Sequence, residues 1–343
     1  MTVLPIAAPP INGLLKWAYT LSVSSYYPET LPWFRTNFAQ VYCNQDFLDR
    51  QTEFVFDFFR GFQPEYTSNP FVQAWVVASK PQPFDPDHIS ENLKECIDEG
   101  YYPVLFVDEQ EISDRAAYHK WSQPHRILLY GYDTEKTVFY TSGLGANLIY
   151  GTHQVPFSEL ESAYRAIRLQ IASCQVPEQD SYLLRFNFGF RYEFDIAAVA
   201  IQLEEYLNGS VTEFRIDRNL EQYAFGSKTY ECLRQYYDAL ANGESLVKRH
   251  DIRHLHILWE HKRLLWERVK YMNDAGWSIN STTIASLQEL SRRCLSLKTL
   301  LIKHGLRPIP KVFEMIHHEL SEIETLEIIA IHKLLNEIGR ASS

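Results

Sequence analysis

The stretch HRILLYGYDTEKTVFYTS, residues 125–142, is the part of this chain that most clearly indicates a local fold. Ile127 to Tyr130 is a short apolar run, and Val138 to Tyr140 is a second one. The residues between them, Asp133 to Lys136, have the composition of a turn. Two apolar runs joined by a polar turn predict a β-hairpin, with His125 at the mouth of its first strand.

Upstream of this hairpin, short apolar runs alternate with Pro, Gly and Asn. Residues 72–77 and 103–107 are predicted strands, because each is a short apolar run rich in β-branched or aromatic residues. A helix is predicted between them, over residues 87–99. Asp87 or Ser90 is its expected cap, and Gly100 is its expected stop. This first half of the chain is therefore expected to mix helices and strands.

Downstream of about residue 177 the sequence becomes mostly helical in pattern. One strand is predicted at 181–186, followed by helices over 195–207, 227–241, 251–273, 281–304 and 311–338. The polar, proline-containing segment 175–180 is the expected linker. We therefore predict an α+β protein. Residues 1–176 would form a domain with an antiparallel sheet, and residues 177–343 a mostly helical domain.

Composition limits the class of protein further. The chain has 343 residues, 45% of them hydrophobic, which suffices for two folded cores. Its net charge of −10 argues against a nucleic-acid partner, and the basic cluster at 248–250 reads as a solvated helix start. No signal peptide and no apolar stretch long enough to cross a membrane is found in the sequence. The five cysteines form no CxxC pair, which predicts reduced thiols and a cytoplasmic location.

Several short motifs resemble a family of papain-like proteins typified by the butirosin-biosynthesis acyltransferase, found in natural-product gene clusters. The strongest is the stretch from His125 to Asp133. The others are Pro9-Pro10-Ile11-Asn12, Pro32-Trp33-Phe34, Asn37-Phe38, Gly100-Tyr101-Tyr102-Pro103-Val104 with Asp108, Asp251-Ile252-Arg253-His254 and Glu260-His261-Lys262. The resemblance spans most of the chain, although each motif is short. It implies a papain-like fold for residues 1–176 followed by a helical domain.

The resemblance also implies an activity. Enzymes of this family take an acyl group from a carrier-protein thioester onto a cysteine and pass it to an amine, forming an amide. A thioesterase or peptidase would use the same residues with a different acceptor. The alternative from another class is a catalytically degenerate relative that binds a carrier protein or a biosynthetic enzyme as a scaffold.

His125 is the candidate general base for such chemistry. Its orienting partner is expected on the returning strand of the hairpin. A hairpin tip at Thr134-Glu135 would pair residue 127 with Ser142, so Thr141 and Ser142 are the polar residues predicted near His125. Family members carry an Asp or Asn there, so Ser142 is a weak orienter, and Asp108 of the neighbouring strand is an alternative.

The nucleophile is the larger gap in the sequence. Papain-like enzymes place a cysteine at the start of the first core helix, where the helix dipole lowers its pKa. Here Gly13 stands at that position, and no cysteine precedes Cys43. Cys43 is the candidate nucleophile if it begins a helix, and otherwise it is a small core residue. The serines at 22, 24 and 25 are further candidates.

No metal or nucleotide cofactor is expected. His254, His256 and His261 lie two and five residues apart, so neither neighbouring pair shares a helical face, as paired metal ligands would. His261 lies on the apolar face of its predicted helix and is expected to be a buried histidine with a hydrogen-bond partner. Motifs for dinucleotide binding, phosphate binding or a serine hydrolase are absent from the sequence.

Overall fold

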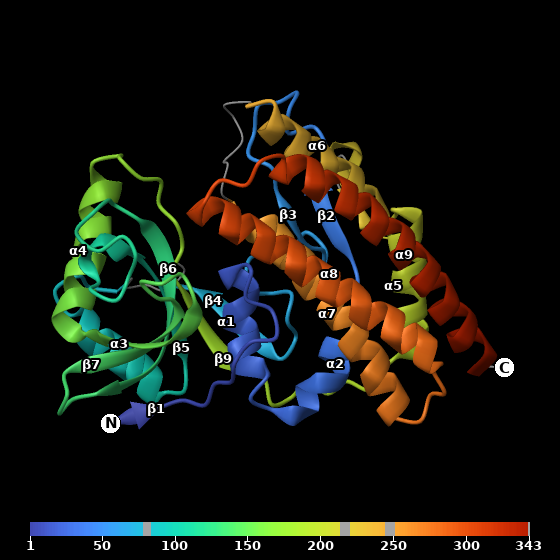
Figure 1. The fold of residues 1–343 in the computed structure, drawn as a ribbon. Coiled ribbons are helices and arrows are strands. Elements are labelled where there is room, and N and C mark those ends of the chain that lie inside the picture. The colour runs from blue at the N-terminus through green and yellow to red at the C-terminus, as the bar shows by residue number, and fades with distance from the viewer. Residues whose placement is uncertain (78–83, 213–219, 244–250, 342–343) are drawn as a thin grey trace. The chain divides into compact units, whose positions relative to one another are not determined.

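The computed structural model describes residues 1–77, 84–212, 220–243 and 251–341. The chain folds into two compact units, and each unit is built from two segments of the sequence. The first unit contains Met1–Thr30 and Pro64–Arg191, and the second contains Leu31–Gln63 and Tyr192–Ser343. Figure 1 labels most of the helices and strands of both units.

An antiparallel sheet forms the centre of the first unit. Within the described residues it has seven strands, in the order β4-β9-β5-β6-β7-β8, with β1 paired to β6. β5 and β1 pair with different parts of the same edge of β6. The strands are β1 (Thr2–Val3), β4 (Val72–Val76), β5 (Tyr102–Asp108), β6 (Pro124–Asp133), β7 (Val138–Leu144), β8 (Tyr150–Pro156) and β9 (Tyr182–Phe186).

Helices cover both faces of this sheet (Figure 1). On one face, α3 (Ile89–Asp98) and α4 (Phe157–Ala172) enclose an apolar core with β5 and β6. On the other face, α1 (Leu15–Ser24) packs against β4, β7 and β9. Short 3₁₀ helices follow α1 at Pro28–Thr30 (η1) and β5 at Glu109–Glu111 (η3). Each strand of the sheet centre is therefore buried by apolar residues on two sides.

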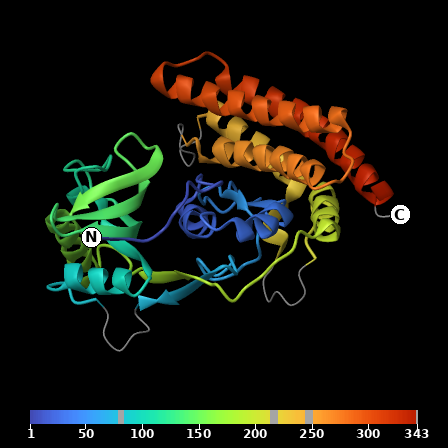
Figure 2. The same cartoon turned by 90° about the horizontal axis from the view of Figure 1, so that it is seen from below.

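The second unit combines a small antiparallel sheet with long helices. Its sheet order is β10-β2-β3, formed by β10 (Tyr223–Phe225), β2 (Val41–Asn44) and β3 (Phe56–Phe58). α8 packs against both α7 and α9, and Figure 2 shows α8 and α9 running beside each other. The helices are α2 (Leu31–Thr36), α5 (Ile196–Asn208), α6 (Thr229–Ala241), α7 (Arg253–Asp274), α8 (Ser281–Leu306) and α9 (Val312–Ala341), with 3₁₀ turns η4 (Leu220–Gln222) and η5 (Gly226–Lys228).

A buried charge network fastens the helices of this unit to one another. Lys262 of α7, with no exposed side-chain surface, donates to Glu327 of α9 at 2.6 Å and to the Tyr206 hydroxyl of α5 at 2.9 Å. The other oxygen of Glu327 accepts from Tyr206 and from Tyr230 of α6. Four helices are thus joined through one ion pair whose remaining hydrogen-bonding groups are satisfied, as a buried pair requires.

The predicted α+β class is confirmed: the sheets are antiparallel and the C-terminal part is helical. The units do not coincide with the predicted domains, however. The strand predicted at 181–186 is β9, which lies between β4 and β5 in the sheet of the first unit. Residues 31–63 in turn belong to the second unit, although they lie inside the predicted first domain.

Helix ends follow the local chemistry in part. Asp195 caps α5 by accepting from the Ala198 N–H, and Gly209 ends that helix in the left-handed conformation, as expected. α3 has neither predicted cap, since its N-cap residue is His88 with no side-chain cap bond. α9 continues through Gly339, where it was expected to stop. The basic cluster at 248–250 lies outside the described residues. No helix in the described ranges has the length and apolar character needed to cross a membrane.

Candidate functional site

His125 is the second residue of β6, opposite Val107 of β5. Its Nδ1 lies 3.1 Å from Oε1 of Glu109, and 35% of its side chain is exposed. Because a carboxylate accepts hydrogen bonds, in the neutral ring Nδ1 carries the hydrogen and Nε2 keeps the lone pair. No described residue hydrogen-bonds to Nε2. This ring is therefore held through one nitrogen, and its other nitrogen is available to accept a proton.

Glu109 reaches His125 because the end of β5 is fixed by hydrogen bonds. The Glu109 N–H donates to the carbonyl oxygen of Gln123, at 3.0 Å. The preceding residue, Asp108, accepts from the backbone N–H groups of Gln110 and Gln123 at 3.0 and 2.7 Å. Successive side chains of an extended segment point in opposite directions. The backbone bonds thus direct Glu109, and not Asp108, toward the histidine.

Asp108 has a structural role instead. Besides the two backbone donors, its carboxylate accepts from Ser122 at 2.7 Å and from Gln170 of α4 at 2.6 Å. Burial opposes ionisation of Asp108, but these donors together hold its pKa below the usual value. The charged carboxylate therefore ties the end of β5 to the start of β6 and to α4. Asp108 does not orient His125, so the alternative expected from the sequence is wrong.

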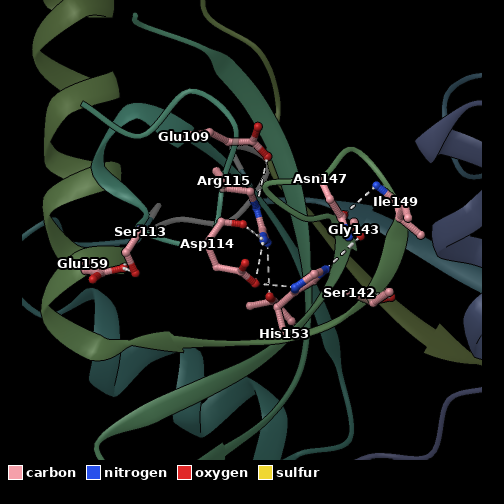
Figure 3. A network of polar contacts seen from close by, with 12 residues as sticks. Glu109, Ser113, Asp114, Arg115, Ser142, Gly143, Asn147, Ile149, His153 and Glu159 are labelled. Atoms are coloured by element: carbon pink, nitrogen blue, oxygen red, sulfur yellow. Dashed lines mark hydrogen bonds and ion pairs between the residues drawn. The ribbon is translucent and has the colours of Figure 1, made fainter. Parts of the chain in front are cut away.

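Arg115 joins Glu109 to a second carboxylate (Figure 3). Its side chain is 1% exposed, with Nε 3.5 Å from Glu109 Oε1 and Nη1 3.8 Å from Asp114 Oδ2. Nη2 donates to Thr141 of β7 at 3.3 Å. A guanidinium cannot lose its proton at ordinary pH, so it is a fixed positive charge between two carboxylates. Arg115 thereby compensates the cost of burying Glu109 beside His125.

His153 of β8 is the second histidine of this network, but its contacts differ from those of His125. Its Nδ1 bonds to Asp114, and its Nε2 lies 3.2 Å from the carbonyl oxygen of Gly143. A carbonyl oxygen only accepts, so Nε2 of His153 must carry a hydrogen and has no lone pair for a substrate proton. His153 connects β7 and β8 to the loop that holds Arg115 (Figure 3). Of the two histidines, only His125 is placed to act as a base.

The structure does not bring Ser142 to His125. Ser142 pairs with Leu128, whereas the tip at Thr134-Glu135 predicted that it would pair with residue 127. Leu128 and His125 are three residues apart on one strand, so they point to opposite faces of the sheet. The Ser142 hydroxyl instead bonds to Tyr150 at 2.9 Å. Thr141 lies on the face of His125, but its hydroxyl accepts from Arg115.

Cys43 is not at a helix start. It lies in β2, a strand of the second unit, and has no exposed surface. Burial, followed by a hydrogen bond with Cys232, raises its pKa well above the usual value. The thiol is therefore protonated at neutral pH, and protonated thiols are poor nucleophiles.

The other candidate nucleophiles are also engaged elsewhere. Ser22 lies 3.0 Å from the Tyr150 hydroxyl, and Ser24 accepts from Asn69 at 3.0 Å. Ser25 is the residue that follows α1 and forms its C-cap. The helix itself begins at Leu15 without a side-chain cap, and Gly13 precedes it. Hence none of the described residues predicted to attack a substrate has a contact with His125.

Sequence reasoning missed four residues of the polar network to which His125 belongs. One signal was available: Asp108 to Glu111 is a polar, acidic segment directly after the buried strand β5. Polar residues at the end of a buried strand commonly hold functional groups. The missed residues are Glu109, Asp114, Arg115 and His153.

Two histidines of α7, His254 and His261, are structural. Nε2 of His254 bonds to the Phe54 carbonyl at 3.0 Å, and Nε2 of His261 to the Ala39 carbonyl at 2.8 Å. Burial lowers the pKa of both, so both are neutral. Within the described ranges, no group of three or more His, Cys, Asp or Glu residues is arranged to hold a metal ion.

Comparisons with known proteins do not assign this chain to a family. A scan against protein-family models found no match, and a search of curated proteins found none either. The site around His125 is therefore the part of the molecule that bears on function.

Proposed function

We propose that this chain transfers an acyl group from a thioester to an amine, with His125 as the general base. The observation that carries the proposal is the contact of His125 Nδ1 with the nearly buried carboxylate of Glu109, which leaves Nε2 unpaired. A histidine held in this tautomer is suited to remove a proton from an attacking group. Arg115 and Asp114 act behind this pair by fixing Glu109.

The resemblance to papain-like acyltransferases of natural-product clusters supports a carrier-protein thioester as the donor. It is also the basis for proposing a papain-like fold for the first unit. The antiparallel sheet with α1 on one face agrees with such a fold at the level of architecture.

The chemistry differs from that of the family at one step. With Cys43 buried and protonated, the amine attacks the thioester carbonyl directly and no acyl-enzyme forms. Nε2 of His125 takes the proton from the attacking amine, and the resulting imidazolium is stabilised by Glu109. The carbon–sulfur bond then breaks, and the leaving thiolate takes the proton from His125. The products are an amide and a free thiol, so protons and electrons balance.

The test is amide formation from simple acyl-thioester surrogates and a panel of amines, followed by mass spectrometry. His125→Asn should lower kcat/KM about 100-fold or more, as loss of a general base does. Glu109→Gln keeps a hydrogen-bond acceptor but loses the charge, so a smaller loss in kcat is expected. His119→Asn is the matched control, because His119 is an exposed histidine of the same unit.

Intact-protein mass spectrometry in the same reactions separates direct attack from a covalent route. No acyl adduct should accumulate, and Cys43→Ala should keep the activity of the wild type. An adduct that disappears in Cys43→Ala would show that the thiol is the nucleophile after all. Equal activity of His125→Asn and His119→Asn would refute the role of His125.

A second function is favoured by a specific observation. α1 begins with Leu15 behind Gly13, where the papain-like pattern requires a cysteine, and the buried Cys43 does not replace it. A catalytically degenerate relative that binds a carrier protein or biosynthetic enzyme would have this structure. Binding of carrier proteins without turnover of any thioester, and with the same affinity in His125→Asn, would support this second function.

A further inference from the structure

Two cysteines of the second unit lie against each other. Cys43 is in the middle strand β2 of the small sheet, and Cys232 is in the first turns of α6, which packs on β2. The two thiols lie close enough for each to shift the pKa of the other, and both residues are buried. Since a disulfide needs its two sulfurs to approach closely, this pair is placed where such a bond can form.

Cys232 also lines a cavity of about 640 Å³ beside α6. Ala224, which pairs with Cys43 from the neighbouring strand β10, lines the same cavity. A small solute that enters it therefore reaches Cys232 first, while Cys43 stays behind it in the sheet. The two thiols are thus unequal in access: one faces the cavity, and the other is covered.

The cavity wall carries one lysine, Lys228, and five carboxylates, those of Asp46, Asp49, Glu221, Glu231 and Glu324. Arg50 pairs with Asp46, and Arg234 pairs with Glu231 and Glu324, so the five acidic groups still outnumber these three basic ones. Such a wall repels anions, so a negatively charged disulfide such as oxidised glutathione is disfavoured in the cavity. A small uncharged oxidant such as hydrogen peroxide does not experience that repulsion. The charge of the wall therefore selects the class of oxidant that reaches Cys232.

The contact also divides the reactivity between the two thiols. By donating its S–H, Cys43 lowers the pKa of Cys232 and stabilises the Cys232 thiolate. Burial and the same bond raise the pKa of Cys43. The thiolate is the form that reacts with peroxides, so Cys232 is the attacking sulfur and Cys43 the resolving one.

We propose that Cys232 and Cys43 form a reversible disulfide in response to a neutral peroxide that enters the cavity beside α6. The Cys232 thiolate attacks one peroxide oxygen, the O–O bond breaks, and a sulfenic acid and hydroxide form; the hydroxide takes up a proton as water. The Cys43 sulfur then attacks the Cys232 sulfur, its proton leaves with the departing hydroxyl as a second water, and the S–S bond forms. The peroxide is reduced and the two thiols are oxidised, so two electrons are transferred in balance.

The proposal is independent of acyl transfer, because none of the residues around His125 takes part. The disulfide would connect β2 to α6, which are far apart in sequence but adjacent in the same unit. A crosslink between distant positions restricts the unfolded chain strongly. The oxidised protein is therefore expected to unfold at a higher temperature than the reduced one.

The experiment treats the full chain, carrying Cys174→Ser to remove the exposed thiol, with hydrogen peroxide or with oxidised glutathione. The protein is then denatured, its free thiols are blocked with N-ethylmaleimide, and its peptides are mapped without reductant. Peroxide should yield a Cys43–Cys232 peptide pair that lacks two hydrogens and separates with dithiothreitol. Oxidised glutathione should yield several-fold less of it.

Cys232→Ser is the matched variant, and in it Cys43 should remain fully alkylated after peroxide. The substituted residue lies in α6 and not in the small sheet, and the map of the parent protein remains a test even if a variant folds poorly. Full alkylation of both cysteines in the peroxide-treated parent would overturn the proposal. So would a sulfinic acid on Cys232 with Cys43 still free, since Cys43 would then not be the resolving thiol.

Discussion

At the scale of single residues, the histidines of this chain show that hydrogen-bond partners decide what an imidazole can do. His125 has a carboxylate on one nitrogen and nothing described on the other, so it can accept a proton. His153 bonds through both nitrogens, and His261 is buried with its Nε2 on a carbonyl. The same side chain is thus a candidate base in one place and a hydrogen-bonding group that stabilises the fold in two others.

The buried His254 leads to a prediction about how the stability of the protein depends on pH. Burial lowers its pKa from 6.5 to about 4, so it stays neutral in the folded protein while the unfolded chain takes up a proton. The free energy of unfolding should therefore fall as the pH drops from about 6.5 to about 4, by up to about 3 kcal/mol for this residue. Urea unfolding at a series of pH values measures the slope.

His254→Gln is the comparison for that slope. A glutamine amide can donate to the Phe54 carbonyl as His254 does, but it does not titrate. The variant should lose part of the pH dependence, and the rest is expected from His261, whose pKa burial also lowers. His119→Asn, at an exposed position, should keep the full slope. An unchanged slope in His254→Gln would contradict the assignment.

At the scale of secondary-structure elements, the hairpin of β6 and β7 shows how a small irregularity changes a site. Asp133 pairs with Val138, so the turn holds four residues and not the two that were predicted. A bulge between Leu129 and Gly131 then shifts the register back by one residue. Because side chains alternate along a strand, a net shift of one residue moves Ser142 to the face opposite His125.

The start of η5 gives a prediction at this scale. Gly226 has φ +55°, and a Cβ there would lie 2.7 Å from the Cα of Tyr206, in the backbone of α5. Gly226→Ala combines a left-handed strain with a backbone overlap, so it should destabilise the second unit by about 3 kcal/mol or more. Thermal unfolding followed by circular dichroism measures the loss.

Gly339→Ala is the control for that substitution. Gly339 lies in α9, and a Cβ there would meet nothing within 4 Å. Alanine favours a helix by up to about 1 kcal/mol over glycine, so this variant should be as stable as the parent or slightly more so. Equal losses in the two variants would mean that the contact with Tyr206 is not what requires Gly226.

At the scale of the whole molecule, the chain crosses between its two units more than once. Residues 31–63 leave the first unit to supply β2 and β3 of the second, and residues 64–191 return to complete the main sheet. β9, the last strand of the first unit in sequence, lies between β4 and β5. Neither unit is therefore a continuous piece of sequence, and a single cut cannot separate them.

This topology predicts the behaviour of fragments. A fragment of residues 1–176 lacks β9, so β4 has no neighbour and one edge of β5 is open. Residues 1–191 contain all the strands described for the main sheet. The shorter fragment should show no cooperative unfolding transition by circular dichroism, whereas the longer one should keep one. Cooperative unfolding of both fragments at the same temperature would contradict the role given to β9.

Local sequence determined most of the elements of this protein. The strands at Val72 and Tyr102 and the helix after Asp195 follow from apolar periodicity, capping and turn chemistry, which act between residues a few positions apart. The same local reasoning singled out His125, since it precedes an apolar strand and a turn. The α+β class follows from where these patterns lie along the chain.

Only the tertiary structure decided which residues surround His125 and which unit each segment joins. Glu109 reaches His125 because Asp108 is held by donors from the residues before β6 and from α4, and Cys43 meets Cys232 because α6 packs on β2. The placement of β9 between β4 and β5 depends likewise on pairing between strands far apart in sequence. Such contacts arise from packing and strand register. Both depend on residues far apart in the sequence, so short-range patterns do not specify them.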